Sequence, residues 1–108
     1  MKKVIIAQDI AAILKKDHSF LDRSDIKSST AATNEEVLAL HRTEKANLII
    51  ANLDMPGMSG DHLCSLIRSD AALRKVSIIL VCAETAENLK RCEQSDANTF
   101  ISSPVNSA

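Results

Sequence analysis

The amino-acid sequence predicts an α/β fold in which a doubly wound parallel sheet of about five strands is covered by helices. Three short apolar runs are rich in branched residues and do not alternate with polar ones, which is typical of strands buried on both faces. These runs are Val4 to Ala7, Leu48 to Ala51 and Ile78 to Val81. Amphipathic segments lie between them, with apolar residues three and four positions apart, as on one side of a helix. Strands and helices that alternate in this way form right-handed crossovers and a parallel sheet.

The remaining elements are predicted from weaker patterns. A first helix is expected around residues 10–21, a polar edge strand at Ile26 to Ser29 and a short last strand at Thr99 to Ile101. Residues that can cap free backbone amides mark the starts of the later helices. They are Asn34, Ser59 or Gly60, and Thr85. The chain therefore reads as a strand and a helix repeated about five times, without a last helix.

The length of the chain, 108 residues, suits one domain, and 45% apolar residues are enough for a single core. We expect residues 1–108 to form that domain. A doubly wound sheet without its last helix leaves apolar strand faces exposed. The sequence therefore indicates either that these residues are the N-terminal part of a longer protein, which we favour, or that a partner chain covers the bare face.

Composition disfavours several classes of partner. The formal net charge is -1, from 13 basic and 14 acidic residues, which provides no strong positive surface for phosphate backbones or anionic lipid. No apolar run approaches the roughly 20 residues that cross a bilayer, and no signal peptide is recognised, so we expect a cytoplasmic protein. The three cysteines are odd in number and lack Cys-x-x-Cys spacing, so neither disulfides nor a zinc site are predicted. The three histidines are expected at the surface or its boundary.

Residues 47–60 read N-L-I-I-A-N-L-D-M-P-G-M-S-G, a buried strand that runs into a tight turn. In open parallel sheets, ligands bind at such carboxyl ends of strands. The segment N-L-D-M-P-G-M-S-G resembles the D-x-x-M-P-x-M-x-G signature of the receiver domains of bacterial response regulators. Three further strand ends, I-I-A-Q-D, I-I-L-V-C-A and F-I-S-S-P, resemble the family in their order and spacing.

This resemblance implies the flavodoxin-like (CheY-like) fold, a five-stranded doubly wound sheet of order 2-1-3-4-5. It also implies a chemistry, because active receivers transfer a phosphoryl group to a strand-end aspartate beside a magnesium ion held by acidic side chains. In this sequence the attacking aspartate aligns with Asn52, and the family's pair of acids aligns with Gln8 and Asp9. The family's hydroxyl residue aligns with Cys82 and its phosphoryl-binding lysine with Ser103.

These substitutions predict a pseudo-receiver. An amide carries no negative charge and cannot form an acyl phosphate, and the other changes remove metal charge and both phosphoryl contacts. We therefore expect a non-phosphorylatable regulatory or protein-interaction module of two-component signal transduction, with no enzymatic activity and no cofactor, to which magnesium binds weakly or not at all. Phe100 aligns with the family's switch aromatic. We expect it to be a core residue, and the alternative is a side chain fixed in one rotamer that holds a single signalling state.

Two alternatives remain open. Asp54 could supply charge for a weak cation site with Asp9, or for residual phosphoacceptor activity, although a solvated turn acid is the preferred interpretation. The vacated pocket around Asp9, Asn52, Cys82 and Ser103 could instead bind a ligand or sense oxidants, although a quiet Cys82 thiol is preferred. The expected partner is another protein or a covalently linked output domain, with a homodimer as a further option, and neither nucleic acid nor membrane.

Overall fold

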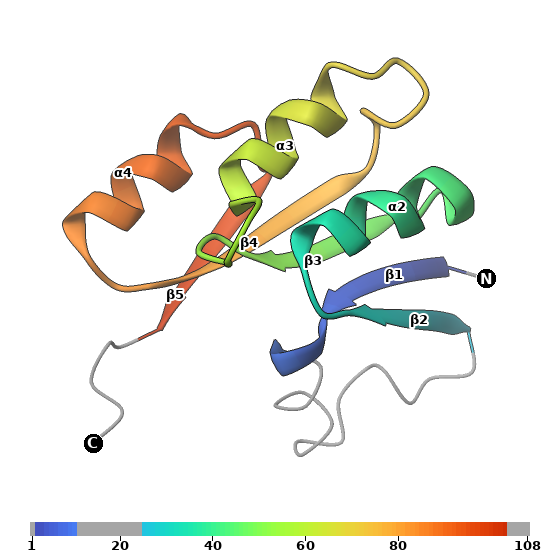
Figure 1. Ribbon diagram of the computed structural model, residues 1–108, viewed down its shortest axis with the longest axis horizontal. Coiled ribbons are helices and arrows are strands. Elements are labelled where there is room, and N and C mark those ends of the chain that lie inside the picture. The colour runs from blue at the N-terminus through green and yellow to red at the C-terminus, as the bar shows by residue number, and fades with distance from the viewer. Residues whose placement is uncertain (1, 11–24, 104–108) are drawn as a thin grey trace.

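The computed structural model of the chain describes residues 2–10 and 25–103 (Figure 1). Residues 8–10 are helical, but most of the first predicted helix falls on residues 11–24, which lie outside the described residues. The other elements, in chain order, are β1 (Lys2–Ala7), β2 (Ile26–Ala31), α2 (Asn34–Glu44), β3 (Leu48–Asn52), α3 (Gly60–Arg68), β4 (Ser77–Ala83), α4 (Ala86–Gln94) and β5 (Thr99–Ser103).

The five strands form one parallel sheet in the order β2-β1-β3-β4-β5 (Figure 1). This order confirms the prediction, and the polar strand β2 lies at an edge as expected. Neighbouring strands pair with Ile6 beside Ile50, Asn52 beside Val81 and Cys82 beside Ser102. Because the strands are parallel, their carboxyl ends all lie along the same edge of the sheet.

Successive side chains of a strand point to opposite faces of the sheet, and both faces of this sheet carry apolar residues. The helices α2, α3 and α4 lie together on one side of the sheet and complete the main core there (Figure 1). On the opposite face, Val4, Ile6 and Ile50 form a smaller buried cluster. Within residues 2–10 and 25–103 no helix follows β5, and Ile101 is 55% exposed. The described residues thus leave the β5 end of this second face open.

Side-chain caps begin the three helices α2, α3 and α4. Ser59 and Thr85 cap α3 and α4, as predicted. The prediction for α2 is wrong by one residue, because Thr33 is the cap and accepts a hydrogen bond from the amide of Glu36 at 3.1 Å. Thr33 has the extended backbone that a cap requires, whereas Asn34 is already helical and fully buried.

His41 is buried in α2, which contradicts the expectation of a surface or boundary position. Its Nδ1 atom accepts a hydrogen bond from the amide of Ala46 at 3.0 Å, and its Nε2 atom lies 3.1 Å from the carbonyl oxygen of Leu73. Since a backbone amide only donates, the ring proton is on Nε2, which donates to Leu73. The imidazole therefore joins the end of α2 to the loop before β4. His62 is exposed as expected, and His18 lies outside the described residues.

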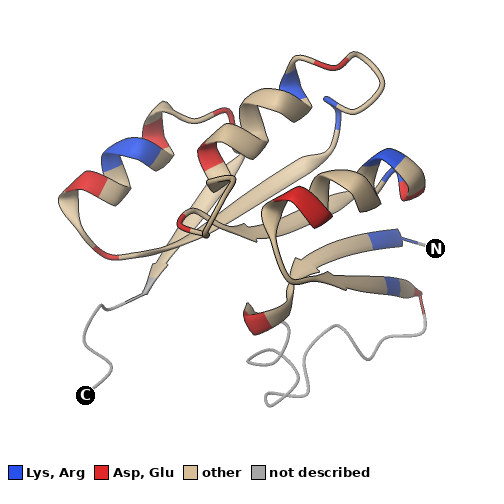
Figure 2. Cartoon of the chain, in the orientation of Figure 1, with Lys and Arg blue, Asp and Glu red and all other residues tan. Residues whose placement is uncertain are grey.

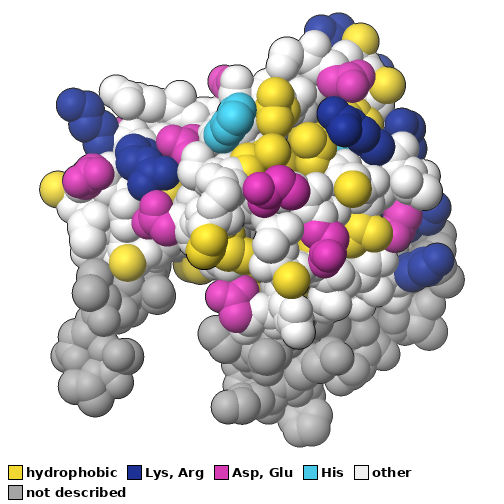
Figure 3. Space-filling model, in the orientation of Figure 1, with side chains coloured by type: hydrophobic (Ala, Val, Ile, Leu, Met, Phe, Trp, Pro, Cys, Tyr) yellow, Lys and Arg dark blue, Asp and Glu magenta, His cyan; other side chains and the backbone are white. Residues whose placement is uncertain are grey.

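Acidic and basic side chains lie at opposite ends of the helices. In α2, α3 and α4 the first turn carries acidic residues and the last turn a basic one, which complements the helix dipole. Because these helices begin at the carboxyl ends of the strands, acidic residues gather along that edge (Figure 2). Acidic, basic and apolar side chains are intermixed on the face viewed in Figure 3. In the described part of the chain, no helix is both long and apolar enough to cross a bilayer.

Candidate functional site

The carboxyl edge of the sheet brings together most of the residues that the sequence singles out. Gln8 and Asp9 directly follow β1, Asn52 ends β3, and Cys82 is the last residue but one of β4. Asp9 and Asn52 are in contact, whereas the side chain of Gln8 is exposed and Cys82 is buried. Ser103 ends β5, but its side chain lies outside what the structure describes.

Asn52 and Asp9 are joined by a hydrogen bond at the position where the resemblance places the attacking aspartate. The Nδ2 atom of Asn52 lies 2.9 Å from Oδ1 and 3.2 Å from Oδ2 of Asp9. Oδ1 of Asp9 also accepts from the amide of Ile10 at 3.0 Å. An ionised aspartate at position 52 could not donate this bond and would set two negative charges against each other. The amide therefore replaces a repulsive pair by a bonded one.

The turn after β3 depends on both glycines of the chain. Gly57 has a φ of 86°, a conformation that residues with a side chain rarely adopt. A Cβ atom on Gly60 would lie 2.6 Å from the carbonyl oxygen of Asn52 and 2.9 Å from the Cα atom of Leu53. The amide of Gly60 donates to the carbonyl oxygen of Leu53 at 2.7 Å, which closes the turn on the strand end.

Two residues at the start of α2 hold the same turn. The buried Asn34 donates through Nδ2 to the carbonyl oxygens of Asn52 and Met58, at 3.1 and 3.0 Å. The carboxylate of Glu35 accepts from the amide of Met58 at 3.2 Å. Sequence reasoning missed this role, because Asn34 is also a good capping residue and no local pattern separates the two uses.

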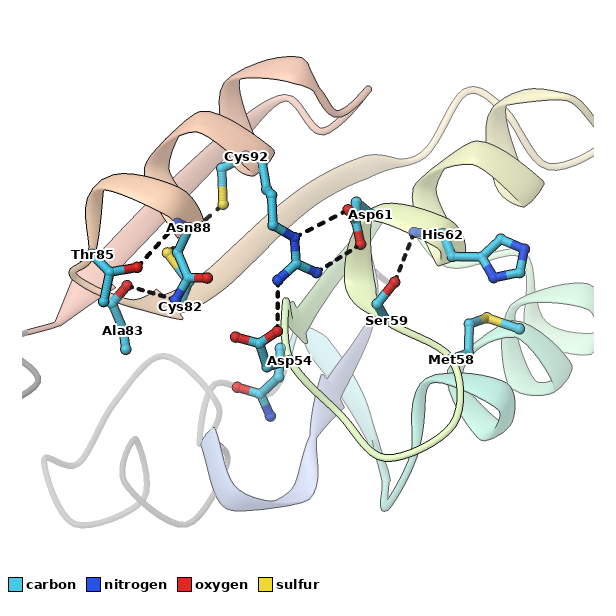
Figure 4. Close-up of polar contacts among 12 residues, drawn as sticks. Asp54, Met58, Ser59, Asp61, His62, Cys82, Ala83, Thr85, Asn88 and Cys92 are labelled. Atoms are coloured by element: carbon cyan, nitrogen blue, oxygen red, sulfur yellow. Dashed lines mark hydrogen bonds and ion pairs between the residues drawn. The ribbon is translucent and has the colours of Figure 1, made fainter.

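Arg91 of α4 forms ion pairs with two acids that flank the turn, Asp54 and Asp61, both of which are labelled in Figure 4. Its Nη1 atom lies 2.8 Å from Oδ1 of Asp54, and its Nη2 atom lies 3.1 Å from Oδ1 of Asp61. The hydrogen bond with Asp61, followed by that with Asp54, raises the pKa of the guanidinium. Burial acts to raise the pKa of Asp61, but hydrogen bonds with Arg91 and Ser59 outweigh it and lower this pKa. Arg91 thus ties α4 to the loop and to the start of α3.

The side chains of Asp54 and Asp9 both have partners in the protein, which weighs against a cation site formed by these two acids. Asp54 faces a guanidinium, which already supplies the positive charge that a metal ion would bring. Asp9 faces the amide of Asn52. Within the ranges that the structure describes, no three His, Cys, Asp or Glu side chains are grouped so that they could hold a metal ion.

Cys82 contacts a second cysteine (Figure 4). The sulfur atom of Cys92, on α4, lies 3.7 Å from that of Cys82, and both residues are buried. Burial, and secondarily the hydrogen bond to Cys82, raises the pKa of the Cys92 thiol to about 12. Burial also raises the pKa of Cys64, on α3, to about 11. The sequence gives no sign of the contact, because it depends on how α4 lies over β4.

Further contacts seat α4 on the end of β4. Asn88 is buried and donates through Nδ2 to the carbonyl oxygen of Ala83 at 3.1 Å (Figure 4). Phe100 of β5 is partly buried and packs against the main core, as predicted. The position of α4 is therefore fixed by a cap, a buried amide, a thiol contact and the ion pairs of Arg91.

Comparison with known proteins identifies the family. The model of the response regulator receiver domain matches residues 4–108, and the chain belongs to this family. The two-component response regulator ORR6 of Oryza sativa is 27% identical over 114 residues, which cover 92% of this chain and 66% of the rice protein. The heme response regulator HssR of Staphylococcus haemolyticus is 26% identical, over 96% of this chain and 46% of that protein. The chain thus spans only part of these relatives.

Solved structures show the same fold. The signal receiver domain of a signal transduction histidine kinase from Syntrophus aciditrophicus has a TM-score of 0.81 and 22% sequence identity, and the match covers 98% of this chain and 81% of that chain. The receiver fold of this chain, with strand order 2-1-3-4-5, is therefore established.

Proposed function

We propose that this receiver domain works without phosphorylation, as a pseudo-receiver that regulates a protein partner or a covalently linked output domain. The observation that carries the proposal is the hydrogen bond from Asn52 to Asp9 at the family's phosphoacceptor position. We place its action in the cytoplasm and assign it no enzymatic activity, no cofactor and no nucleic-acid contact of its own.

The chemistry of phosphoryl transfer supports the proposal. An acyl phosphate forms when a carboxylate oxygen attacks phosphorus, and the amide of Asn52 has neither the charge nor a nucleophilic lone pair on nitrogen. Catalysis of this transfer rests mainly on positioning and charge stabilisation, which a magnesium ion and a lysine supply in the family. Here Gln8 removes one metal-binding carboxylate, and Ser103 stands in place of the lysine.

The contacts of Asp54 weigh against residual phosphoacceptor activity. One of its oxygens lies 2.8 Å from Arg91, and the resulting ion pair neutralises the charge that would attack phosphorus. The same guanidinium also holds α4 through Asp61. A phosphoryl group would thus find no differential contact through which to shift α4, and we expect one dominant conformation.

The experiment that tests this function exposes the chain to acetyl phosphate and magnesium and measures its intact mass. We expect no gain of about 80 Da, the mass of one phosphoryl group. The variant Asn52→Asp should gain little, because the other three positions remain altered. The fourfold variant Gln8→Asp, Asn52→Asp, Cys82→Thr, Ser103→Lys is the matched positive control and should gain the group. A stoichiometric, base-labile gain on the parent chain would contradict the proposal.

The contact between Cys82 and Cys92 favours a second candidate, a receiver that responds to oxidants through thiols. Thermal unfolding in the presence of nucleotides, metal ions or oxidants separates this candidate from a purely protein-binding module. Stabilisation by an oxidant alone would favour the thiol response.

A further inference from the structure

The sulfur atoms of Cys82 and Cys92 are in direct contact beneath α4 (Figure 4). They lie 3.7 Å apart, and the two residues are only 6% and 3% exposed. Cys82 faces the helices because it shares a strand face with Ile78 and Leu80 in the main core. Cys92 belongs to the same core from the buried side of α4. Tertiary packing therefore pairs two thiols from different elements.

The two sulfur atoms lie at van der Waals contact, with no other atom between them. A disulfide has a sulfur–sulfur distance of about 2.05 Å, so each sulfur atom has to move by only about 0.8 Å. Rotation of the two side chains about their χ1 angles can supply a movement of this size. The contact thus brings both reactants of an oxidation within reach of each other.

We propose that Cys82 and Cys92 form a reversible disulfide when the protein meets a hydroperoxide, and that this crosslink acts as an input to the domain in place of a phosphoryl group. The inference rests on the proposed function, because it names a signal for a receiver whose phosphoacceptor position holds an amide. It assigns Cys92 as the partner of a thiol that sequence reasoning treats as unreactive.

The reaction balances with hydrogen peroxide as the oxidant. The thiolate of Cys82 attacks one peroxide oxygen, the O–O bond breaks, and Cys82 becomes a sulfenic acid while hydroxide leaves and is protonated to water. The thiolate of Cys92 then attacks the sulfenic sulfur, the S–S bond forms, and a second water leaves. In total, two thiols give two electrons and two protons to one peroxide. A thiol reductant reverses the change.

Burial sets the rate of the second step. The pKa of Cys92 is raised to about 12 by burial and by its contact with Cys82, while Arg91 lowers it and Asp61 raises it through their charges. Because the thiolate is the reacting form, little of it is present at neutral pH. The rate of this second step should therefore rise between pH 7 and pH 9.

The crosslink acts on the position of α4. It joins the last turn of this helix to the end of β4, where Asn88 already bonds to Ala83. Amide hydrogen exchange across residues 86–94 should become slower after oxidation, by about tenfold or more, because local opening of the helix is then restrained. The same measurement on Cys92→Ser should show no such change.

The test is peptide mapping of the whole chain after oxidation. The protein is treated with hydrogen peroxide at pH 7 and pH 9, its remaining thiols are alkylated, and trypsin is added. Trypsin places Cys82 in residues 76–90 and Cys92 in residues 92–108, while Cys64 stays in residues 46–68. We expect the first two peptides to be linked, with a mass about 2 Da below their sum, and to separate on reduction. The linked form should accumulate faster at pH 9.

Two matched variants sharpen the result. Cys92→Ser should abolish the linked peptide, whereas Cys64→Ser should retain it. Crosslinks that involve Cys64 or two chains would overturn the proposal, as would free Cys82 and Cys92 after treatment of the folded parent at pH 9. Peptide mapping of the parent chain tests the proposal by itself, so the result stands even if a variant fails to fold. The readout is a crosslink and not a phosphate, so its failure would leave the proposed function, tested by phosphoryl mass, intact.

Discussion

The side-chain amide of Asn52 bonds to both carboxylate oxygens of Asp9, at 2.9 and 3.2 Å, across the ends of β3 and β1. Where two acids would repel each other, an amide and an acid attract. Asn52 therefore gives Asp9 a hydrogen-bond donor at this edge of the sheet, where a second acid would repel it.

Restoring the acid should cost stability. Asn52→Asp is expected to lower the free energy of unfolding by about 1 kcal/mol at pH 7 without magnesium, because it removes a donor and adds a like charge in a partly exposed site. Repulsion raises the pKa of the new carboxyl above its unfolded value, so the loss should shrink as pH falls toward 4. Urea unfolding at both pH values measures this difference.

Asn52→Ala provides the control, since it removes the amide without adding charge and should lose similar stability at both pH values. Equal stability of Asn52→Asp and the parent at pH 7 would show that charge relief is not the reason an amide stands at this position.

Magnesium should bind weakly or not at all. Gln8 and Asn52 each remove a carboxylate that attracts the ion, and each loss weakens the attraction by something on the order of 1 kcal/mol or more. Calorimetric titration at moderate salt measures the affinity. Arg91→Gln frees Asp54 and should strengthen binding by a few-fold at most. Submillimolar affinity in the parent would revive the weak cation site formed by Asp9 and Asp54.

The ion pair between Arg91 and Asp61 should make stability depend on acid pH. Because the pKa of Asp61 is lowered in the folded chain, the pair stabilises the fold above the ordinary value of 3.8 and is lost as pH falls through the lowered pKa. Arg91→Met should cost about 1 kcal/mol or less at pH 7, since both side chains are partly solvated. This cost should shrink as the pH falls below 3.8 and Asp61 takes up a proton.

Lys90→Met is the matched control for that prediction, because the exposed Lys90 precedes Arg91 on α4. Its unfolding free energy should stay near that of the parent from pH 3 to pH 7. An equal loss for Lys90→Met and Arg91→Met would indicate a general charge effect and not the specific pair.

Asn34 should be important for stability although it caps nothing. Asn34→Ala leaves the carbonyl oxygens of Asn52 and Met58 without their buried donor, which should cost about 1–3 kcal/mol. Thr33→Ala removes the actual cap and should cost about 1 kcal/mol. Chemical denaturation of both variants compares the two roles, and a negligible loss for Asn34→Ala would contradict the assignment.

The strands could be predicted because burial on both faces requires unbroken branched residues, as in Ile78 to Val81. Their ends could not, since the hydrogen bonds of the sheet continue into less apolar residues and extend β4 from Ser77 to Ala83. The meeting of Asp9 and Asn52 could be expected from the strand order that the family resemblance implies, because neighbouring parallel strands end at one edge.

The remaining contacts of the site depend on packing between distant elements. Nothing near Arg91 or Cys92 in the sequence indicates which residues α4 packs against. Asn34 belongs to a residue type that often caps helices, so the sequence suggests a cap at that position. Likewise, His41 reads as a surface polar residue until the loops that satisfy its two ring nitrogens are in place. Tertiary hydrogen bonding, which local patterns do not encode, decided each of these positions.

The most direct measurement of whether the domain still switches is its amide ¹H–¹⁵N spectrum before and after addition of magnesium with beryllofluoride, a phosphoryl mimic that binds receiver carboxylates. The pseudo-receiver proposal predicts unchanged resonances at Asn52, at Ala83 and throughout α4, because the position that would hold the mimic carries an amide bonded to Asp9. Saturable shifts at these residues would contradict it, since they would show that the site still accepts a phosphoryl-like group and transmits its binding to the helix.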